Sequence, residues 1–194
     1  MNKLTDEIAD YNTRHGRTAT RLTYLLPVAQ QWRDSLDSHT EFQWNENIGL
    51  MLAADKDLRD TFIYITLNQH LTDDDIIRLV LSPNEPKSRA LAVNIMQDAY
   101  GNPDSDYDPN RLIAAITNLA TALESKNTFV ADTAATVIAF LDLYLGETEE
   151  AETLATIAAK HDKGNTLAAI VLTMIHDKKL PAKALRMDNI LANA

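Results

Sequence analysis

The residues best suited to chemistry in this sequence form two copies of the tripeptide His-Asp-Lys. His161-Asp162-Lys163 and His176-Asp177-Lys178 flank a run that is almost entirely apolar. Imidazole and carboxylate groups can act together as a general base or bind a metal ion. The pattern leaves two interpretations open: a pair of catalytic or metal-binding groups, or the ends of two successive helices.

The residues that follow each copy favour the second interpretation. Gly164 follows the first copy and Pro181 follows the second. Glycine is favoured just past a helix end, and proline interrupts a helix. If the helices on either side of Gly164 pack antiparallel, their C-termini are separated by a helix of about 13 residues, roughly 20 Å. We therefore expect no metal or substrate site shared by the two histidines.

The second candidate site is a charged stretch, AADKDLRD, inside an otherwise apolar segment. Arg59 stands between Asp57 and Asp60 in this stretch. A guanidinium at the edge of a core usually fixes helix packing through a carboxylate. The alternative is a ligand-binding pocket that contains Arg59, Asp60 and His70. An enclosed cavity with convergent polar groups would favour this pocket.

An alternating acidic triplet, Asp104, Asp106 and Asp108, resembles the start of a calcium loop. An EF-hand loop needs glycine at its sixth position and glutamate at its twelfth. This chain has Pro109 and Ala115 there, so a capped turn is expected instead. The Glu-x-x-His, His-Glu-x-x-His and Gly-x-Ser-x-Gly motifs and a Gly-rich phosphate loop are also missing. We predict no catalytic residues, no metal and no cofactor.

Composition narrows the class of protein further. The chain has no cysteine, which excludes disulfides and thiolate chemistry. A net charge of -10 works against non-specific binding to nucleic acid. The basic patch of Arg14, Arg17 and Arg21 could contact a phosphate, but a solvated helix face is favoured. With a polar N-terminus and no apolar run near the roughly 20 residues of a membrane span, we expect a cytoplasmic protein without membrane contact.

Apolar spacing is helical nearly throughout, and glycine is scarce, so the sequence predicts an all-α bundle of about 8–9 helices. We expect one domain over 1–194, within which 1–45 could form a helical subdomain beside a core of 46–194. Helix boundaries are expected at a kink at Pro27, a break near Asp55, and caps at the residues Thr72, Asp108 and Thr128. Helical segments are predicted at 3–14, 22–36, 48–67 (one long helix or two with a break near Asp55), 73–81, 86 to about 101, 109–123, about 130–145, 148–161, 167–175 and from Pro181 onward.

Small residues in the last third are spaced as in tetratricopeptide-type helical hairpins. They are Ala139, Gly146, Ala151, Ala155 and Ala158. Alanines allow two antiparallel helices to approach closely, and the glycine makes the turn between them. The spacing predicts one such hairpin, with helices at about 130–145 and 148–161.

Three stretches resemble the C-terminal half of the actinobacterial domain-of-unknown-function family 4192. They are LMLAADKDLRDTFIYI with Arg59 and Asp60, ATVIAFLDLYLGETEEAETLATIAA, and NTLAAIVLTMIHDKKLPAKALR with Arg186. The resemblance covers roughly residues 48–187. It implies a helical fold and brings no known activity with it.

The leading hypothesis for function is a non-enzymatic helical module that binds a protein partner, which could be a second copy of the chain. An exposed apolar or aromatic groove between helices would support it. One alternative is a small-ligand protein or enzyme with the pocket near Arg59 and Asp60. A further alternative is an acidic mimic of nucleic acid.

Overall fold

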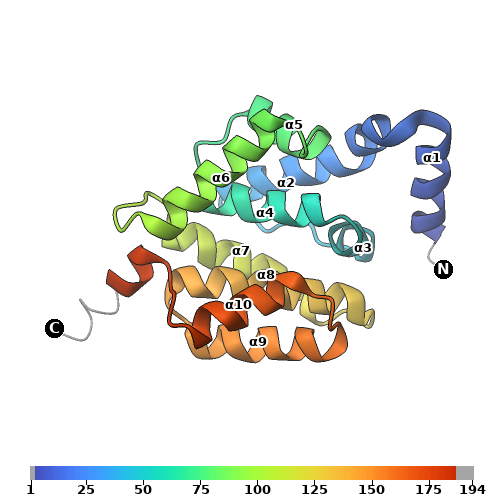
Figure 1. The fold of residues 1–194 in the computed structure, drawn as a ribbon. Helices are drawn as coiled ribbons and strands as arrows, with labels where there is room; N and C mark the ends of the chain where they lie inside the picture. Colours follow the sequence, from blue (N-terminus) through green and yellow to red (C-terminus); the bar gives the residue numbers. More distant parts are fainter. Residues whose placement is uncertain (1–2, 187–194) are drawn as a thin grey trace.

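A computed structural model describes residues 3–186 (Figure 1). Within that range the chain forms ten α-helices and one π-helical turn, without any strand. The prediction of an all-α bundle is confirmed. The elements are α1 (Lys3–Thr20), η1 (Arg21–Leu25), α2 (Leu26–Asp37), α3 (Glu46–Ala54), α4 (Lys56–Leu67), α5 (Asp73–Leu81), α6 (Pro86–Gly101), α7 (Pro109–Leu123), α8 (Thr128–Leu145), α9 (Thr148–His161) and α10 (Thr166–His176).

The helices pack in two layers, with α1 at one edge (Figure 1). We call η1, α2, α4, α5 and α6 the N-terminal layer and α7 to α10 the C-terminal layer. Helix α3 contacts both α4 and α8, and α4 also contacts α7 and α8. The two layers therefore share one interior. The segment after Pro181 is helical over residues 182–186, and the rest of the predicted terminal helix lies outside the described residues.

Side-chain caps set most of the helix boundaries that the sequence predicts. Asp55 ends α3 and caps α4, accepting a hydrogen bond from the Leu58 amide at 2.9 Å. Thr72 forms a capping box with Asp75 at the start of α5. Two predictions were wrong: Asn127, not Thr128, caps α8, and the first helix continues past residue 14 to Thr20, with a kink at Gly16.

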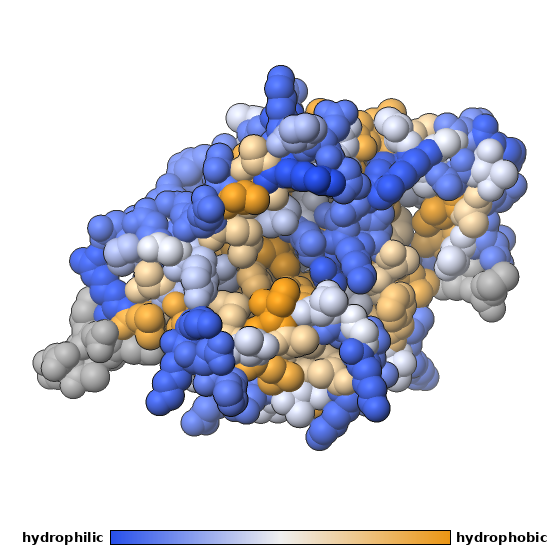
Figure 2. Space-filling view, in the orientation of Figure 1, coloured by the Kyte–Doolittle hydropathy of each residue, from blue (hydrophilic) through white to orange (hydrophobic). Residues whose placement is uncertain are grey.

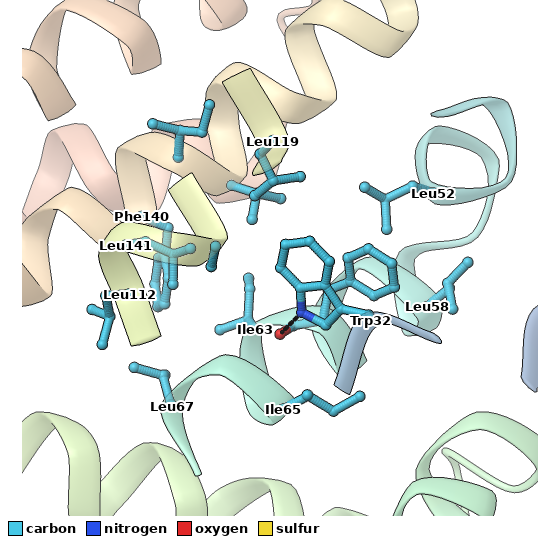
Figure 3. Close-up of a cluster of buried hydrophobic side chains, with 14 of the residues drawn as sticks. Trp32, Leu52, Leu58, Ile63, Ile65, Leu67, Leu112, Leu119, Phe140 and Leu141 are labelled. Atoms are coloured by element: carbon cyan, nitrogen blue, oxygen red, sulfur yellow. Dashed lines mark hydrogen bonds between the residues drawn. The ribbon is translucent and has the colours of Figure 1, made fainter. Parts of the chain in front are cut away.

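The core is centred on Trp32, whose side chain is fully buried (Figure 3). Its indole stacks on Phe62 with ring centroids 4.6 Å apart. Its Nε1 donates hydrogen bonds to the Phe62 carbonyl and the Thr66 hydroxyl at 3.3 and 3.2 Å. Leucines from the other layer, including Leu112 and Leu119, belong to the same cluster of buried side chains, so one continuous core joins the two layers (Figure 3).

The predicted hairpin of small residues is present as α8 and α9. Gly146 ends α8 in the left-handed conformation, with φ 85°, which favours glycine. Ala151, Ala155 and Ala158 on α9 are all fully buried against its neighbours. The antiparallel pairing of these helices is therefore confirmed as geometry, whereas kinship with tetratricopeptide repeats stays a prediction.

Helix α8 is long and apolar enough to span a membrane by length and composition alone. Its 18 residues are 78% buried inside the protein, where α3, α7, α9 and α10 surround it. The core helix of a bundle has the same composition because every face of it meets another helix.

Two arginines are buried instead of exposed, and neither burial was anticipated. Arg21 donates to the Val80 carbonyl at 2.8 Å and to the carboxylates of Asp55 and Asp57 at 2.6 and 2.9 Å. Arg111 binds the Asp37 carboxylate and the Ile65 carbonyl. The interpretation of Arg21 as part of a solvated basic face was wrong, because its side chain is only 2% exposed.

Candidate functional site

Two of the three predicted site residues, Arg59 and Asp60, line the same cleft between the two layers. His70 does not. Its Nε2 lies 2.8 Å from the Asp106 carboxylate on an exposed part of the surface, and both side chains are more than 60% exposed. His70 therefore contributes to a surface ion pair outside the cleft.

The central cleft has a volume of about 450 Å³ and opens between α4, α6, α8 and α10. Most of its wall is apolar or aromatic, and Ile170 on its rim is 49% exposed. Figure 2 shows apolar side chains gathered around a hollow on this face, with polar residues surrounding them. The lining consists of Arg59, Asp60, Ile63, Tyr64, Met96, Tyr100, Phe140, Tyr144, Thr166, Leu167, Ile170 and Met174.

Arg59 and Asp60 form an ion pair between neighbouring residues in the cleft wall. Arg59 donates from Nε and Nη2 to one oxygen of Asp60, at 2.9 and 2.7 Å. Burial raises the pKa of Asp60, and Arg59 offsets only part of that rise. The guanidinium is mostly buried, with 13% of the side chain exposed. Its Nη1 forms no hydrogen bond to any of the described residues, so this nitrogen is available to a ligand.

Three tyrosines and Thr166 supply the remaining polar side chains of the cleft. Burial raises the pKa of Tyr64 to about 12, so its hydroxyl stays protonated at neutral pH. Tyr100 donates to the Lys179 carbonyl at 3.3 Å. The Tyr144 hydroxyl is buried and has no hydrogen-bond partner among residues 3–186. A buried hydroxyl without a partner costs free energy, and this oxygen is closed to solvent.

Two further hollows adjoin the central cleft through shared residues. The first, about 290 Å³, shares Asp60 and Tyr64 with it and extends along α6. The second, which we call the polar hollow, is about 190 Å³ and shares Arg59 and Thr166. Because the three hollows share wall residues, we refer to them together as the groove.

The two His-Asp-Lys copies contribute nothing to this groove as a pair. His161 lies at the end of α9, with its Nδ1 2.8 Å from the Asp132 carboxylate, whereas His176 ends α10 and contacts Asp177. Because α9 and α10 run antiparallel, the histidines lie at opposite ends of the layer (Figure 1). Gly164 is not in the left-handed conformation expected of it; Asp162 ends α9 and accepts a hydrogen bond from the Gly164 amide at 2.8 Å.

The acidic triplet is engaged in separate contacts. Asp104 pairs with Arg186, Asp106 with His70, and Asp108 caps α7. Over the described part of the chain, no group of three or more histidines and acidic residues is placed to hold a metal ion.

No protein-family model, no curated protein and no solved structure matches this chain. The resemblance to family 4192 therefore stays a prediction. The candidate site rests on the geometry of the groove.

Sequence reasoning identified one wall of the groove and missed the others. Arg59 stood out because it is charged within an apolar segment. Met96, Ile170 and Met174 have the helical spacing of core residues, and on that pattern they are indistinguishable from buried ones. Ile170 and Met174, one turn apart on α10, line the opening instead. Only the packing of α10 against the other layer distinguishes the two cases.

Proposed function

We propose that this protein is a non-enzymatic helical module that binds a segment of a partner protein in the groove between its layers. The observation that carries the proposal is the chain of three adjoining hollows with an apolar and aromatic centre. Partner segments bind such grooves by inserting large apolar side chains between helices. Met96 and Met174 on the walls of the cleft suit this role, because methionine adapts its shape to different apolar surfaces.

The polar groups of the cleft favour binding over catalysis. A general base must lie within hydrogen-bond reach of the proton that it removes and be free to accept it. Asp60 accepts two hydrogen bonds from Arg59 on one of its oxygens, and the charge of Arg59 opposes protonation of this carboxylate. Tyr64 holds its proton at neutral pH because its pKa is raised to about 12. These groups can orient a bound segment without changing it chemically.

Selection from a library of displayed random peptides tests the proposal. The wild-type protein is compared with Ile170→Ser, which removes an exposed apolar side chain from the rim of the cleft. The control is Ile157→Ser on the outer face of α9, where the side chain is 43% exposed and lies outside the groove. We expect peptides with large apolar residues that bind wild type and Ile157→Ser alike and bind Ile170→Ser at least several-fold more weakly. Equal binding to all three proteins would contradict the proposal.

A small-ligand protein is the second candidate function. The central cleft has a volume of about 450 Å³, within the range of about 300–1,000 Å³ typical of small-molecule sites, and Arg59 and Asp60 line it. A thermal-shift screen of aromatic metabolites separates the two functions. A compound that raises the melting temperature of wild type but not of Arg59→Ala would favour the small ligand.

The acidic-mimic alternative has less support. Many exposed carboxylates pair with arginines, as Asp10 does with Arg14 and Asp73 with Arg33. Charges of both signs are therefore mixed on the surface. A mimic of nucleic acid needs an array of carboxylates at the spacing of phosphates.

A further inference from the structure

We infer that the groove selects an amphipathic anion, with a large apolar group in the central cleft and a carboxylate or similar anionic group at Lys56 and Arg59 in the polar hollow. The inference rests on the proposed function, which gives the source of the anionic group. In a segment of a partner protein, that group is an acidic side chain beside a large apolar one. It adds the chemistry of the recognised segment, which an apolar cleft alone leaves open.

The polar hollow differs in chemistry from the cleft that it adjoins. Residues of α3, α4, α8, the loop between α9 and α10 and the start of α10 line it, and most of these are small or polar: Ala53, Ala54, Lys56, Arg59, Phe129, Thr133, Thr136, Asp162, Gly164, Asn165 and Thr166. Its volume of about 190 Å³ is less than half that of the central cleft. It suits a small polar group better than a second large apolar side chain.

Two cationic side chains face this hollow from one side of α4. Lys56 and Arg59 are three residues apart, so they project from the same helix face. Within residues 3–186, no carboxylate lies within ion-pair distance of Lys56. Lys56 therefore adds a second positive charge to the wall of this hollow, beside an apolar cleft in a protein of net charge -10.

The acidic groups around the groove are themselves engaged. Asp60 binds Arg59, and Asp57 binds Arg17 and Arg21. Asp162, on the far wall of the polar hollow, accepts the Gly164 amide and is held in the loop between α9 and α10. Charges beyond about 8 Å are largely screened at physiological ionic strength. An anion in the polar hollow therefore meets Lys56 and Arg59, with Asp162 as the one carboxylate of the same lining, more than the acidic surface as a whole.

The shared lining fixes how the two halves of the ligand must be joined. Arg59 and Thr166 border both the central cleft and the polar hollow. A single short linkage therefore suffices between the apolar group and the anion. Arg59 Nη1, which no described residue engages, lies on the guanidinium at this border.

Two fluorescent dyes that differ only in charge test the inference directly. Anilinonaphthalene sulfonate carries an anionic group on an aromatic body, and N-phenylnaphthylamine is its uncharged counterpart. Each is titrated against wild type, Lys56→Glu and Lys160→Glu. The two variants change the net charge equally, but Lys160 is exposed on α9 and lies outside the groove. Ile170→Ser serves as the variant with an altered cleft.

We expect wild type and Lys160→Glu to bind the sulfonate dye about tenfold more tightly than the neutral dye, a preference that corresponds to one charge-assisted contact. Lys56→Glu should abolish this preference and leave the neutral dye unaffected, and added salt should reduce it. Ile170→Ser should weaken both dyes. Equal affinities of wild type for the two dyes, or equal effects of Lys56→Glu and Lys160→Glu, would overturn the inference. If the dyes behave as expected but peptide selection fails, the anion site stands and the protein partner does not.

Discussion

Two regions of this molecule bring helices together by opposite means. Around Arg21, the elements η1, α4 and α5 meet through a buried guanidinium that binds a carbonyl and two carboxylates. Between α8 and α9, the contact is made by alanines that are fully buried and carry no polar group. The first junction depends on hydrogen-bond direction, and the second depends on the closeness of two backbones.

The two junctions differ in the kind of substitution that destabilises them. A buried ion pair contributes little net stability while intact, but removal of one partner leaves an uncompensated charge. An alanine interface contains no charged group whose removal could weaken it. Its close packing leaves no room for a larger side chain. The two regions should therefore respond to different substitutions.

The largest effect is expected at the polar junction. Arg21→Met keeps much of the side-chain volume and leaves Asp55 and Asp57 without their buried partner. We expect the free energy of unfolding to fall by roughly 3–5 kcal/mol, measured by urea denaturation. Arg14→Met is the control, because Arg14 and Asp10 are both about 60% exposed and such pairs contribute at most about 1 kcal/mol. Similar losses in the two variants would show that the junction around Arg21 is not special.

The alanine interface is disrupted by volume. Ala155 is fully buried between α9 and its neighbours, so Ala155→Leu inserts three carbon atoms where close-packed helices leave no space. We expect a loss of about 3 kcal/mol in the free energy of unfolding. Glu152→Leu, on the exposed face of the same helix, should change stability by less than about 0.5 kcal/mol. A well-folded Ala155→Leu variant of unchanged stability would mean that α8 and α9 pack more loosely than described.

A third test concerns two buried carboxylates on α8 that differ in their partners. Asp132 lies 2.8 Å from His161, whereas the Asp142 carboxylate has no hydrogen bond to the described residues. Burial, with Glu150 and Glu147 nearby, raises the pKa of Asp142 to about 7. The folded state therefore binds this proton more tightly than the unfolded state. The resulting stability is present below about pH 4 and is lost as the pH rises through about 7.

Asp142→Asn should remove this dependence on pH. The full shift would correspond to about 4 kcal/mol, and screening at the rim of the hairpin reduces the expected gain to about 2 kcal/mol at pH 8. Near pH 4 the variant and wild type should be equally stable. Asp132→Asn is the control and should lose stability, because it weakens the contact with His161. The measurement is urea denaturation at both pH values; destabilisation of Asp142→Asn at pH 8 would contradict the raised pKa.

Most of the local structure was predictable because it depends on short-range chemistry. Thr72 and Asp108 bond amides two or three residues ahead, so their roles as caps follow from sequence alone. Gly146 ends α8 for the same local reason. Asn127 shows the limit: it stands next to Thr128, both residues can cap a helix, and spacing does not decide between them.

The burial of arginines and the walls of the groove were not predictable in this way. Arg21 meets Val80 across 59 positions and Arg111 meets Asp37 across 74. Such contacts depend on which helices become neighbours, and helical spacing carries no information on that. The cleft likewise depends on which helices become neighbours. Arg59 was identifiable as unusual from the sequence, but its position in a cleft with α10 follows only from the fold.

The smallest effect is expected at the contact between α3 and α8. Gly49 is buried there, and a methyl group in place of its hydrogen would lie 2.5 Å from a γ-carbon of Val130. Valine has a stiff side chain and cannot easily move away. Alanine stabilises a helix by up to about 1 kcal/mol relative to glycine. We expect the clash with Val130 to exceed this gain, so that Gly49→Ala lowers the free energy of unfolding by about 1 kcal/mol. Gly101→Ala is the control: it has open space around it and should be neutral or slightly stabilised. If Gly49→Ala were as stable as Gly101→Ala in urea denaturation, α3 could shift freely on α8.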